Sequence, residues 1–125
     1  MNKNKSMRTA LIIVLLLTTF FTLQLLSQKH KYNRALECIA DCDYRLALSY
    51  LDNLPTYKDS TVLAEYASIM SNYNPNDFES IYSCYHSLKD ISPELTNKKL
   101  SGEFIRAETE ISTIYENYNV LTLCK

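Results

Sequence analysis

Four cysteines and two histidines are the residues of this chain whose side chains could bind a metal or act as nucleophiles. Cys38 and Cys42 are four residues apart, which places them one turn apart on one face of a predicted helix. A structural zinc site needs four such ligands, usually in paired spacings. The other candidates lack this pairing and are His30, Cys84, His86 and Cys124. The sequence therefore predicts no metal site and no cofactor.

The same residues give little support for an enzyme. Cys84 and His86 are two residues apart on a predicted helix, so their side chains diverge, whereas a cysteine nucleophile needs its base within hydrogen-bond reach. The single glycine leaves no material for a glycine-rich phosphate loop. We therefore expect no catalytic residue and cysteines that pack as small apolar groups. Export would permit a disulfide such as Cys84 to Cys124.

Charge argues against nucleic acid as a partner. Beyond residue 28 the chain holds ten basic and fourteen acidic residues, a net charge of −4. Nucleic-acid-binding domains present a basic face or stripe instead. Carboxylates such as Glu108 and Glu110 are expected on a solvated helix face. Residues 29–125 have the length of a single domain with one modest core, and nothing in them indicates a small-molecule substrate.

An uncharged apolar run precedes that domain. Residues 9–28, between Arg8 and Lys29, hold no ionisable side chain. Twenty helical residues reach about 30 Å, the thickness of the hydrocarbon layer of a bilayer. The sequence therefore predicts a basic tail over 1–8, a transmembrane helix over 9–28 and a soluble domain over 29–125.

The apolar run could also be a signal peptide. Signal peptides have a shorter apolar core and then small residues at the cleavage site. Here the apolar character persists to Leu26, and Ser27 is the only small residue at its exit, with Leu25 where a second should stand. A retained anchor is the favoured interpretation, and cleavage is the alternative.

The orientation of the span depends on its flanking charges, which are equal in number. The basic residues are Lys3, Lys5 and Arg8 before the run and Lys29, Lys31 and Arg34 after it. The free amino terminus adds one positive charge to the first group. We therefore favour a cell-membrane protein with a cytoplasmic N-terminus and an extracytoplasmic domain.

Polar residues inside the span offer a second role for it. Thr18, Thr22 and Gln24 could hydrogen-bond to a partner helix within the membrane. Alternatively, the threonine hydroxyls bond back to carbonyl groups of their own helix.

Apolar residues of the domain recur every three to four positions, as in helices that bury one face. The predicted stripes cover 32–42, 44–54, 62–73, 78–88 and 100–118. The first helix either continues from the span or bends near Ser27. Asp59 or Ser60, Asp77 and Ser92–Pro93 are the expected helix starts, while Pro55 and Asn74–Asn76 are the expected breaks. Gly102 is a weak point in the last helix.

Two of these helices resemble each other in sequence. DYRLALSYLDNL from Asp43 matches DFESIYSCYHSL from Asp77 at an offset of 34 residues, and the same offset relates Tyr32 to Tyr66. Thirty-four residues is the period of tetratricopeptide repeats. The segment CDYRLALSYLDNL resembles their second-helix motif, and TYKDS resembles a junction of degenerate bacterial repeat proteins. The resemblance covers about residues 30–92.

This resemblance implies an all-α fold with two helix pairs and a C-terminal capping helix. Such repeats commonly present a groove for a peptide or protein. A plain five-helix bundle is the alternative. Tyrosine is common at interfaces, and Tyr50, Tyr57 and Tyr115 are the expected exposed contacts. The tyrosines expected to pack in the core are Tyr32, Tyr66, Tyr73, Tyr82 and Tyr85.

The sequence as a whole predicts a non-catalytic, single-pass membrane protein whose helical-repeat domain tethers or scaffolds a protein partner at the membrane. One alternative is a small bitopic regulator that contacts a larger membrane complex through its span. The other is a secreted binding module released by cleavage.

Overall fold

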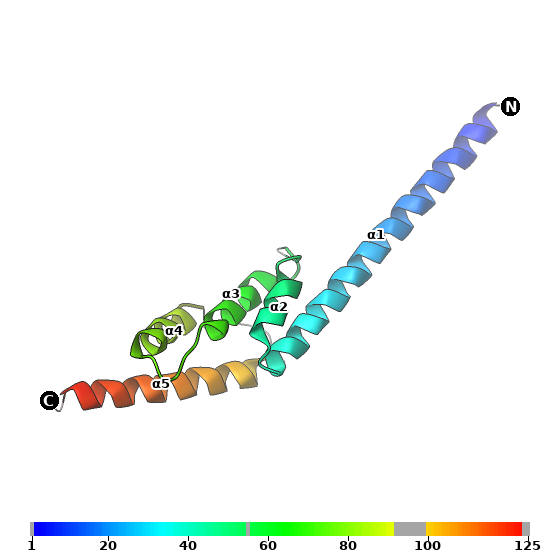
Figure 1. Ribbon diagram of the computed structural model, residues 1–125. Coiled ribbons are helices and arrows are strands. Elements are labelled where there is room, and N and C mark those ends of the chain that lie inside the picture. Colours follow the sequence, from blue (N-terminus) through cyan, green and yellow to red (C-terminus); the bar gives the residue numbers. More distant parts are fainter. Residues whose placement is uncertain (1, 55, 92–99, 124–125) are drawn as a thin grey trace.

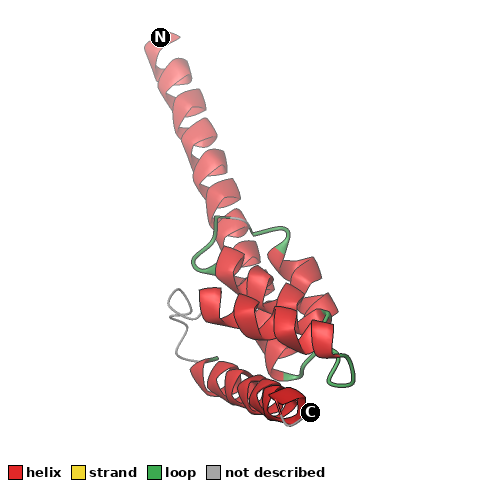
Figure 2. Cartoon of the chain, turned by 90° about the vertical axis from the view of Figure 1, so that its left-hand side faces the viewer, coloured by secondary structure: helices red, strands yellow, loops and turns green. Residues whose placement is uncertain are grey.

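The computed structural model describes residues 2–54, 56–91 and 100–123. Every regular element in these ranges is a helix, which confirms the all-α class (Figure 2). The helices are α1 (Asn2–Ala40), α2 (Tyr44–Leu51), α3 (Ser60–Ser71), α4 (Phe78–Ile91) and α5 (Ser101–Leu123). The expected start of the last helix, at Ser92–Pro93, lies outside the described residues.

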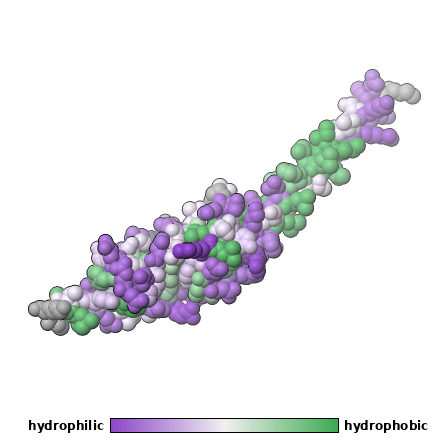
Figure 3. All heavy atoms as spheres, viewed as in Figure 1, coloured by the Kyte–Doolittle hydropathy of each residue, from purple (hydrophilic) through white to green (hydrophobic). Residues whose placement is uncertain are grey.

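α1 is a single helix of 39 residues that extends from the apolar run into the domain without a break at Ser27 (Figure 1). Its apolar residues 9–26 are all exposed and form a separate green stretch in Figure 3. Its buried residues begin at Tyr32 and end at Ile39. Of the described helices, α1 alone is long and apolar enough to cross a membrane. One continuous helix therefore carries both the apolar run and part of the core.

The C-terminal end of α1 corrects one expectation about the cysteines. The backbone N–H of Asp43 donates to the carbonyl of Cys38 at 2.8 Å, and that of Cys42 donates to Ile39 at 3.0 Å. Cys42 itself has a left-handed φ of 61°, the conformation that commonly ends a helix. Cys42 is therefore exposed beyond the helix while Cys38 is buried within it. The prediction that they share a helix face was wrong.

Aspartates precede three of the helices, of which Asp59 and Asp77 were expected and Asp43 was not. Asp43 Oδ1 accepts the backbone N–H of Leu46 at 3.2 Å, and Asp77 Oδ1 accepts that of Glu79 at 3.3 Å. These bonds satisfy N–H groups that have no partner within the first helical turn. Asp59 also precedes its helix, but its side chain makes no cap bond and instead accepts the hydroxyl of Tyr32 in α1.

The core lies where each helix packs on its neighbours in sequence, α1 on α2, α2 on α3, α3 on α4 and α4 on α5. Its least exposed large side chains are Tyr66, Ile39, Leu51, Leu54, Leu63, Ile81, Leu88, Leu100 and Ile111. The stripes predicted for residues 44–54 and 100–118 are confirmed as buried or half-buried faces.

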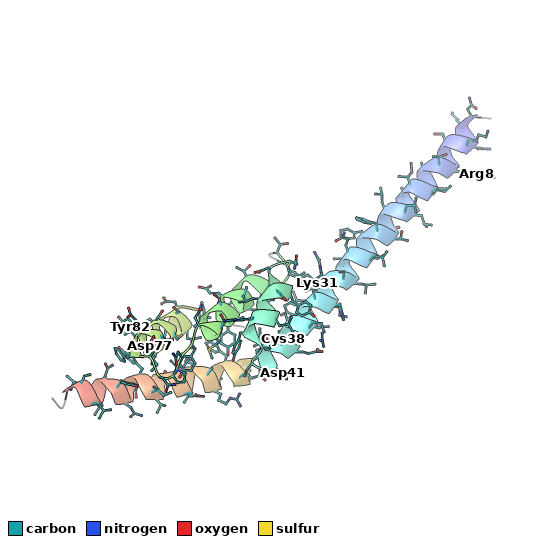
Figure 4. The ribbon with its side chains drawn as sticks, viewed as in Figure 1. Arg8, Lys31, Cys38, Asp41, Asp77 and Tyr82 are labelled. Carbon is teal, nitrogen blue, oxygen red and sulfur yellow. The ribbon has the colours of Figure 1, made fainter. Side chains whose placement is uncertain are left out.

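Two of the predicted stripes needed correction. The stripe predicted within 62–73 consisted of Val62, Tyr66, Ile69, Met70 and Tyr73. α3 contacts helices on two sides, so it also buries Leu63 and Ala67. α4 buries Cys84 and leaves Phe78 and Tyr82 at its edge, 42% and 48% exposed. Tyr82, which was expected in the core, lies near Asp77 at the end of the domain far from Lys31 (Figure 4).

Gly102 offers a direct test of α5. It is exposed in the first turn, and a Cβ placed on it would meet no atom within 4 Å. We expect Gly102→Ala to raise the free energy of unfolding by about 0.5–1 kcal/mol, because alanine loses less backbone entropy on folding. The measurement is urea unfolding of the full chain in detergent, followed by circular dichroism. The control Ala107→Gly, on the same helix, should lower stability; no gain for Gly102→Ala would contradict a helix through this position.

Candidate functional site

A cleft lies between four helices. It is bounded by the C-terminal end of α1, by the first residue of α2, and by α3 and α5. Its volume is about 320 Å³, at the lower end of the range for ligand pockets. Its walls are formed by Ile39, Cys42, Tyr44, Tyr66, Met70, Tyr73, Glu103, Arg106, Ala107, Glu110 and Ile111. Aromatic and aliphatic side chains thus form most of the cleft, and charged groups enter it only from α5.

Helical spacing explains why these side chains converge. Tyr66 and Met70 are one turn apart on α3, and Tyr73 lies two residues beyond the end of that helix. On α5, Glu103 and Glu110 are two turns apart, so both lie on the face toward α3. Two facing helices therefore supply the long walls of the cleft.

Two polar atoms in the cleft have no hydrogen-bond partner within the described part of the chain. They are the hydroxyl oxygen of Tyr73 and Oε2 of Glu103, and both are shielded from solvent. Buried polar atoms are nearly always hydrogen-bonded, and leaving one without a partner costs about 1–3 kcal/mol. Glu103 also borders a shallower hollow lined by Asn33 and Glu37. Two residues that line the cleft thus each keep one shielded polar atom without a described partner.

The electrostatics of the cleft favour neutral phenols. Burial raises the pKa of Tyr44, and hydrogen bonding to Cys42 and the neighbouring Tyr66 raise it further. Burial also raises the pKa of Tyr66, and the carboxylate of Glu103 adds to that shift. The pKa of Tyr73 is raised by burial and then by the charge of Glu110. Burial is thus the main cause of the three raised pKa values, and the carboxylates of Glu103 and Glu110 add a smaller effect on Tyr66 and Tyr73.

A second aromatic feature joins α4 to α5. The rings of Tyr85 and Tyr115 stack with their centroids 4.3 Å apart. The ring centroids of Phe78 and Tyr118 are 5.5 Å apart. Tyr82 contacts His86 at 4.4 Å. We call these six residues, Phe78, Tyr82, Tyr85, His86, Tyr115 and Tyr118, the aromatic cluster. Each such ring pair adds about 0.5–1.5 kcal/mol beyond the apolar area it buries, so the cluster holds α5 to the domain.

The three tyrosines expected as exposed contacts are all half-buried. Tyr50, Tyr57 and Tyr115 pack against the core. Tyr57 lies edge-on to Tyr32 at 5.4 Å, and Tyr115 stands at the centre of the aromatic cluster. The structure thus brings none of the three together and places none of them in the cleft.

The threonine hydroxyls of the apolar run bond to carbonyl groups of α1 itself. The hydroxyl of Thr18 donates to the carbonyl of Leu15 at 2.8 Å, and that of Thr22 donates to Thr19 at 2.9 Å. These are bonds within the helix itself. Gln24 is exposed.

The cysteines and histidines do not converge in the described ranges. No group of three or more His, Cys, Asp or Glu side chains there is placed to hold a metal ion. Cys84 is buried, its thiol lies 3.6 Å from the carbonyl of Ile69, and burial raises its pKa. His86 contacts tyrosine rings of the aromatic cluster instead. Cys124, the expected disulfide partner of Cys84, lies outside the described residues.

Sequence reasoning missed the cleft. The sequence feature that indicates it is the pair Glu103 and Glu110. These two residues lie on the same side of a helix whose apolar stripe was correctly identified. Glu110 was expected on a solvated face; it is exposed, yet it borders the cleft. The partners of these carboxylates come from α3, and sequence spacing on one helix cannot show which helix will face it.

The aromatic cluster yields a stability prediction. Tyr115→Ala removes the ring that contacts Phe78, Tyr82 and Tyr85, so the free energy of unfolding should fall by about 2 kcal/mol or more. Tyr82→Ala removes a more exposed ring and should cost about 1 kcal/mol or less. Urea unfolding of both variants measures the difference. Equal losses would show that Tyr115 does not organise the α4–α5 contact.

The phenols of the cleft yield a pH prediction. In the unfolded chain they ionise near pH 10, whereas in the folded chain their raised pKa values keep them protonated. Their contribution to stability is therefore complete below about pH 10 and is lost as the pH rises further. We expect a smaller loss in the double variant Tyr44→Phe, Tyr73→Phe. Urea unfolding at pH 8 and pH 11 tests this, and an unchanged loss would contradict it.

Protein-family models, curated proteins and solved structures were each compared with this chain, and none matches it. We therefore base the functional proposal on α1, the cleft and the aromatic cluster.

Proposed function

We propose that this protein is a single-pass membrane protein whose helical domain binds a protein partner and holds it at the membrane, without catalysis. One observation carries the proposal: α1 exposes the apolar residues 9–26 on all sides and, without a break, buries Tyr32 to Ile39 in the domain. An exposed apolar surface of this extent is costly in water and favourable in a bilayer. The domain would therefore be joined to the membrane by a helix it shares.

The orientation is part of the proposal. We place the N-terminus in the cytoplasm and the domain outside it, because a short basic segment before an anchor, here with Lys3, Lys5 and Arg8, most often stays cytoplasmic. The basic residues after the run would then lie among the headgroups on the other side.

A recurrent spacing of 34 residues supports the binding role. α2 and α4 begin at Tyr44 and Phe78, 34 residues apart, and each follows an aspartate. At the same offset, Tyr32 and Tyr66 are both buried, as are Leu54 and Leu88. We propose that α1 with α2 and α3 with α4 form two tetratricopeptide-like pairs and that α5 caps them. Stacked helix pairs of this kind form extended concave binding surfaces.

The alternatives define what the experiments must separate. In the bitopic regulator the span itself would bind a membrane complex; two of its three candidate residues, Thr18 and Thr22, use their hydroxyls within α1. In the secreted module, cleavage after Ser27 would leave the buried residues intact, because these begin at Tyr32. Neither alternative gains support from a contact in the domain.

Membrane fractionation tests the anchor. We expect the full chain to stay in membranes washed with carbonate and to keep Met1 on N-terminal sequencing. Leu16→Arg places a charge in the middle of the run, at a cost of about 2.5–3.5 kcal/mol for insertion, and should reduce membrane recovery. Leu121→Arg is the control, because Leu121 is equally exposed but lies on α5. A soluble wild type, or one that starts beyond Ser27, would contradict a retained anchor.

Exchange of the span tests the binding role. Replacing residues 9–28 by an unrelated apolar helix should leave cross-linked partner recovery from detergent-solubilised membranes unchanged, because the domain makes the contacts. Loss of the partner would instead support the bitopic regulator. Partner recovery by the Leu121→Arg chain, whose span is unchanged, again serves as the control for a change on the domain surface.

A further inference from the structure

We propose that the domain makes a second contact with the membrane, through the loop between α2 and α3, where Tyr57 and Lys58 bind phospholipid headgroups. The structure describes this loop over residues 52–54 and 56–59. The inference rests on the proposed anchor, because it takes residues 9–28 as the span. It adds a lipid-binding surface in a part of the chain that is remote from the span in sequence.

The loop lies at the end of the domain that faces the apolar run. Figures 1 and 2 both show it beside α1, on the side toward the N-terminus, with the C-terminal end of α5 at the opposite end of the domain. The hydroxyl of Tyr32 in α1 donates to the carboxylate of Asp59 in the loop. The rings of Tyr32 and Tyr57 meet edge to face, with their centroids 5.4 Å apart. The loop is thus fixed to the point where α1 enters the core.

Helix geometry gives the depth of the loop in a bilayer. Tyr32 follows Gln28, the last residue of the uncharged run, by four residues, or about 6 Å along the helix axis. Side chains of a helix lean toward its N-terminus, here toward the membrane, so the Tyr32 ring lies closer still. The headgroup layer is about 5–8 Å thick on each side of the hydrocarbon. The ring, and the groups that touch it, therefore lie at the level of the headgroups.

Lys58 places a cation at that level. Its Nζ lies 4.8 Å from the centroid of the Tyr32 ring and 5.4 Å from that of Tyr57. The two ring faces hold the ammonium in place. Lys58 is exposed, and it takes no part in an ion pair within the described part of the chain. Its φ of 48° is a conformation that glycine or asparagine adopts more readily, so the side chain, rather than the turn, accounts for a lysine here.

The neighbouring groups suit the phosphate of a lipid headgroup. Lys29 and Lys31 lie on α1 at the same level and add two positive charges to that of the loop lysine. The acidic residues of the described loop are Asp52, which is exposed, and Asp59, which is half-buried and bonded to α1. Three ammonium groups thus face two carboxylates, and each can donate charge-assisted hydrogen bonds to phosphate oxygens. Tyrosine, like Tyr57, is common at the boundary between membrane and water.

Tryptophan fluorescence tests the contact, because the chain has no tryptophan of its own. The full chain with Tyr57→Trp is reconstituted in vesicles of phosphatidylcholine and phosphatidylglycerol, and it should lose fluorescence when both leaflets contain lipid with a nitroxide on its headgroup. Tyr118→Trp is the matched control and should keep its fluorescence, since Tyr118 is also half-buried but lies in the C-terminal part of α5. Circular dichroism of each variant confirms that it is folded.

Charge reversal tests the role of Lys58. In the Tyr57→Trp chain, Lys58→Glu should weaken the quenching, because a single lysine near an anionic surface changes its occupancy there about fivefold. Lys89→Glu is the control and should leave the quenching unchanged. Lys89 is also exposed and also lies over a tyrosine ring, 4.6 Å from the centroid of Tyr85, but it belongs to α4.

A third tryptophan separates failure of this inference from failure of the anchor. Phe20→Trp lies within the apolar run and should be quenched by a nitroxide on the lipid acyl chain if α1 spans the bilayer. Quenched Phe20→Trp beside unquenched Tyr57→Trp would overturn the loop contact and leave the anchor in place. If neither is quenched, the anchor fails and the loop contact fails with it. Equal quenching of Tyr118→Trp, or no effect of Lys58→Glu, would also overturn the proposal.

Discussion

The structure depends on one helix that must satisfy two environments. The first part of α1 is apolar on all sides and exposed, whereas its last turns bury Tyr32, Ala35, Leu36 and Ile39. A helix satisfies its own backbone hydrogen bonds wherever it lies, so the change of environment requires only a change of side chains. That change takes place between Gln28 and Tyr32, and the domain assembles on the part that follows.

The rest of the domain is held together by contacts between helices that are neighbours in the sequence. α1 is held to the loop before α3 by the hydroxyl of Tyr32, which donates to Asp59, and Lys58 lies 4.8 Å from the centroid of the same ring. At the other end the aromatic cluster joins α4 to α5, and Tyr66 contacts Phe104 across the middle at 5.6 Å. Because α5 returns past α3, it closes the cleft.

Much of this fold could be predicted from the sequence, because amphipathic stripes and caps are local signals. The helix stripes at 44–54 and 100–118 and the cap at Asp77 were identified correctly. The errors have tertiary causes: Cys42 lies outside α1 because the chain turns with a positive φ, and Tyr82 lies at the edge of the contact between α4 and α5, where it stays half-exposed. The cleft could not be predicted, since it exists only where α3 faces α5.

The continuity of α1 fixes the orientation of the domain relative to residues 9–28 as well as its position. Because no flexible linker separates residues 9–28 from the core, the domain turns about the axis of α1 only when the whole helix turns. Each residue added between Gln28 and Tyr32 would rotate the domain relative to the preceding helix by about 100° and raise it by about 1.5 Å. In a bilayer, the number of residues in α1 would thus determine the direction in which the cleft faces around the helix axis.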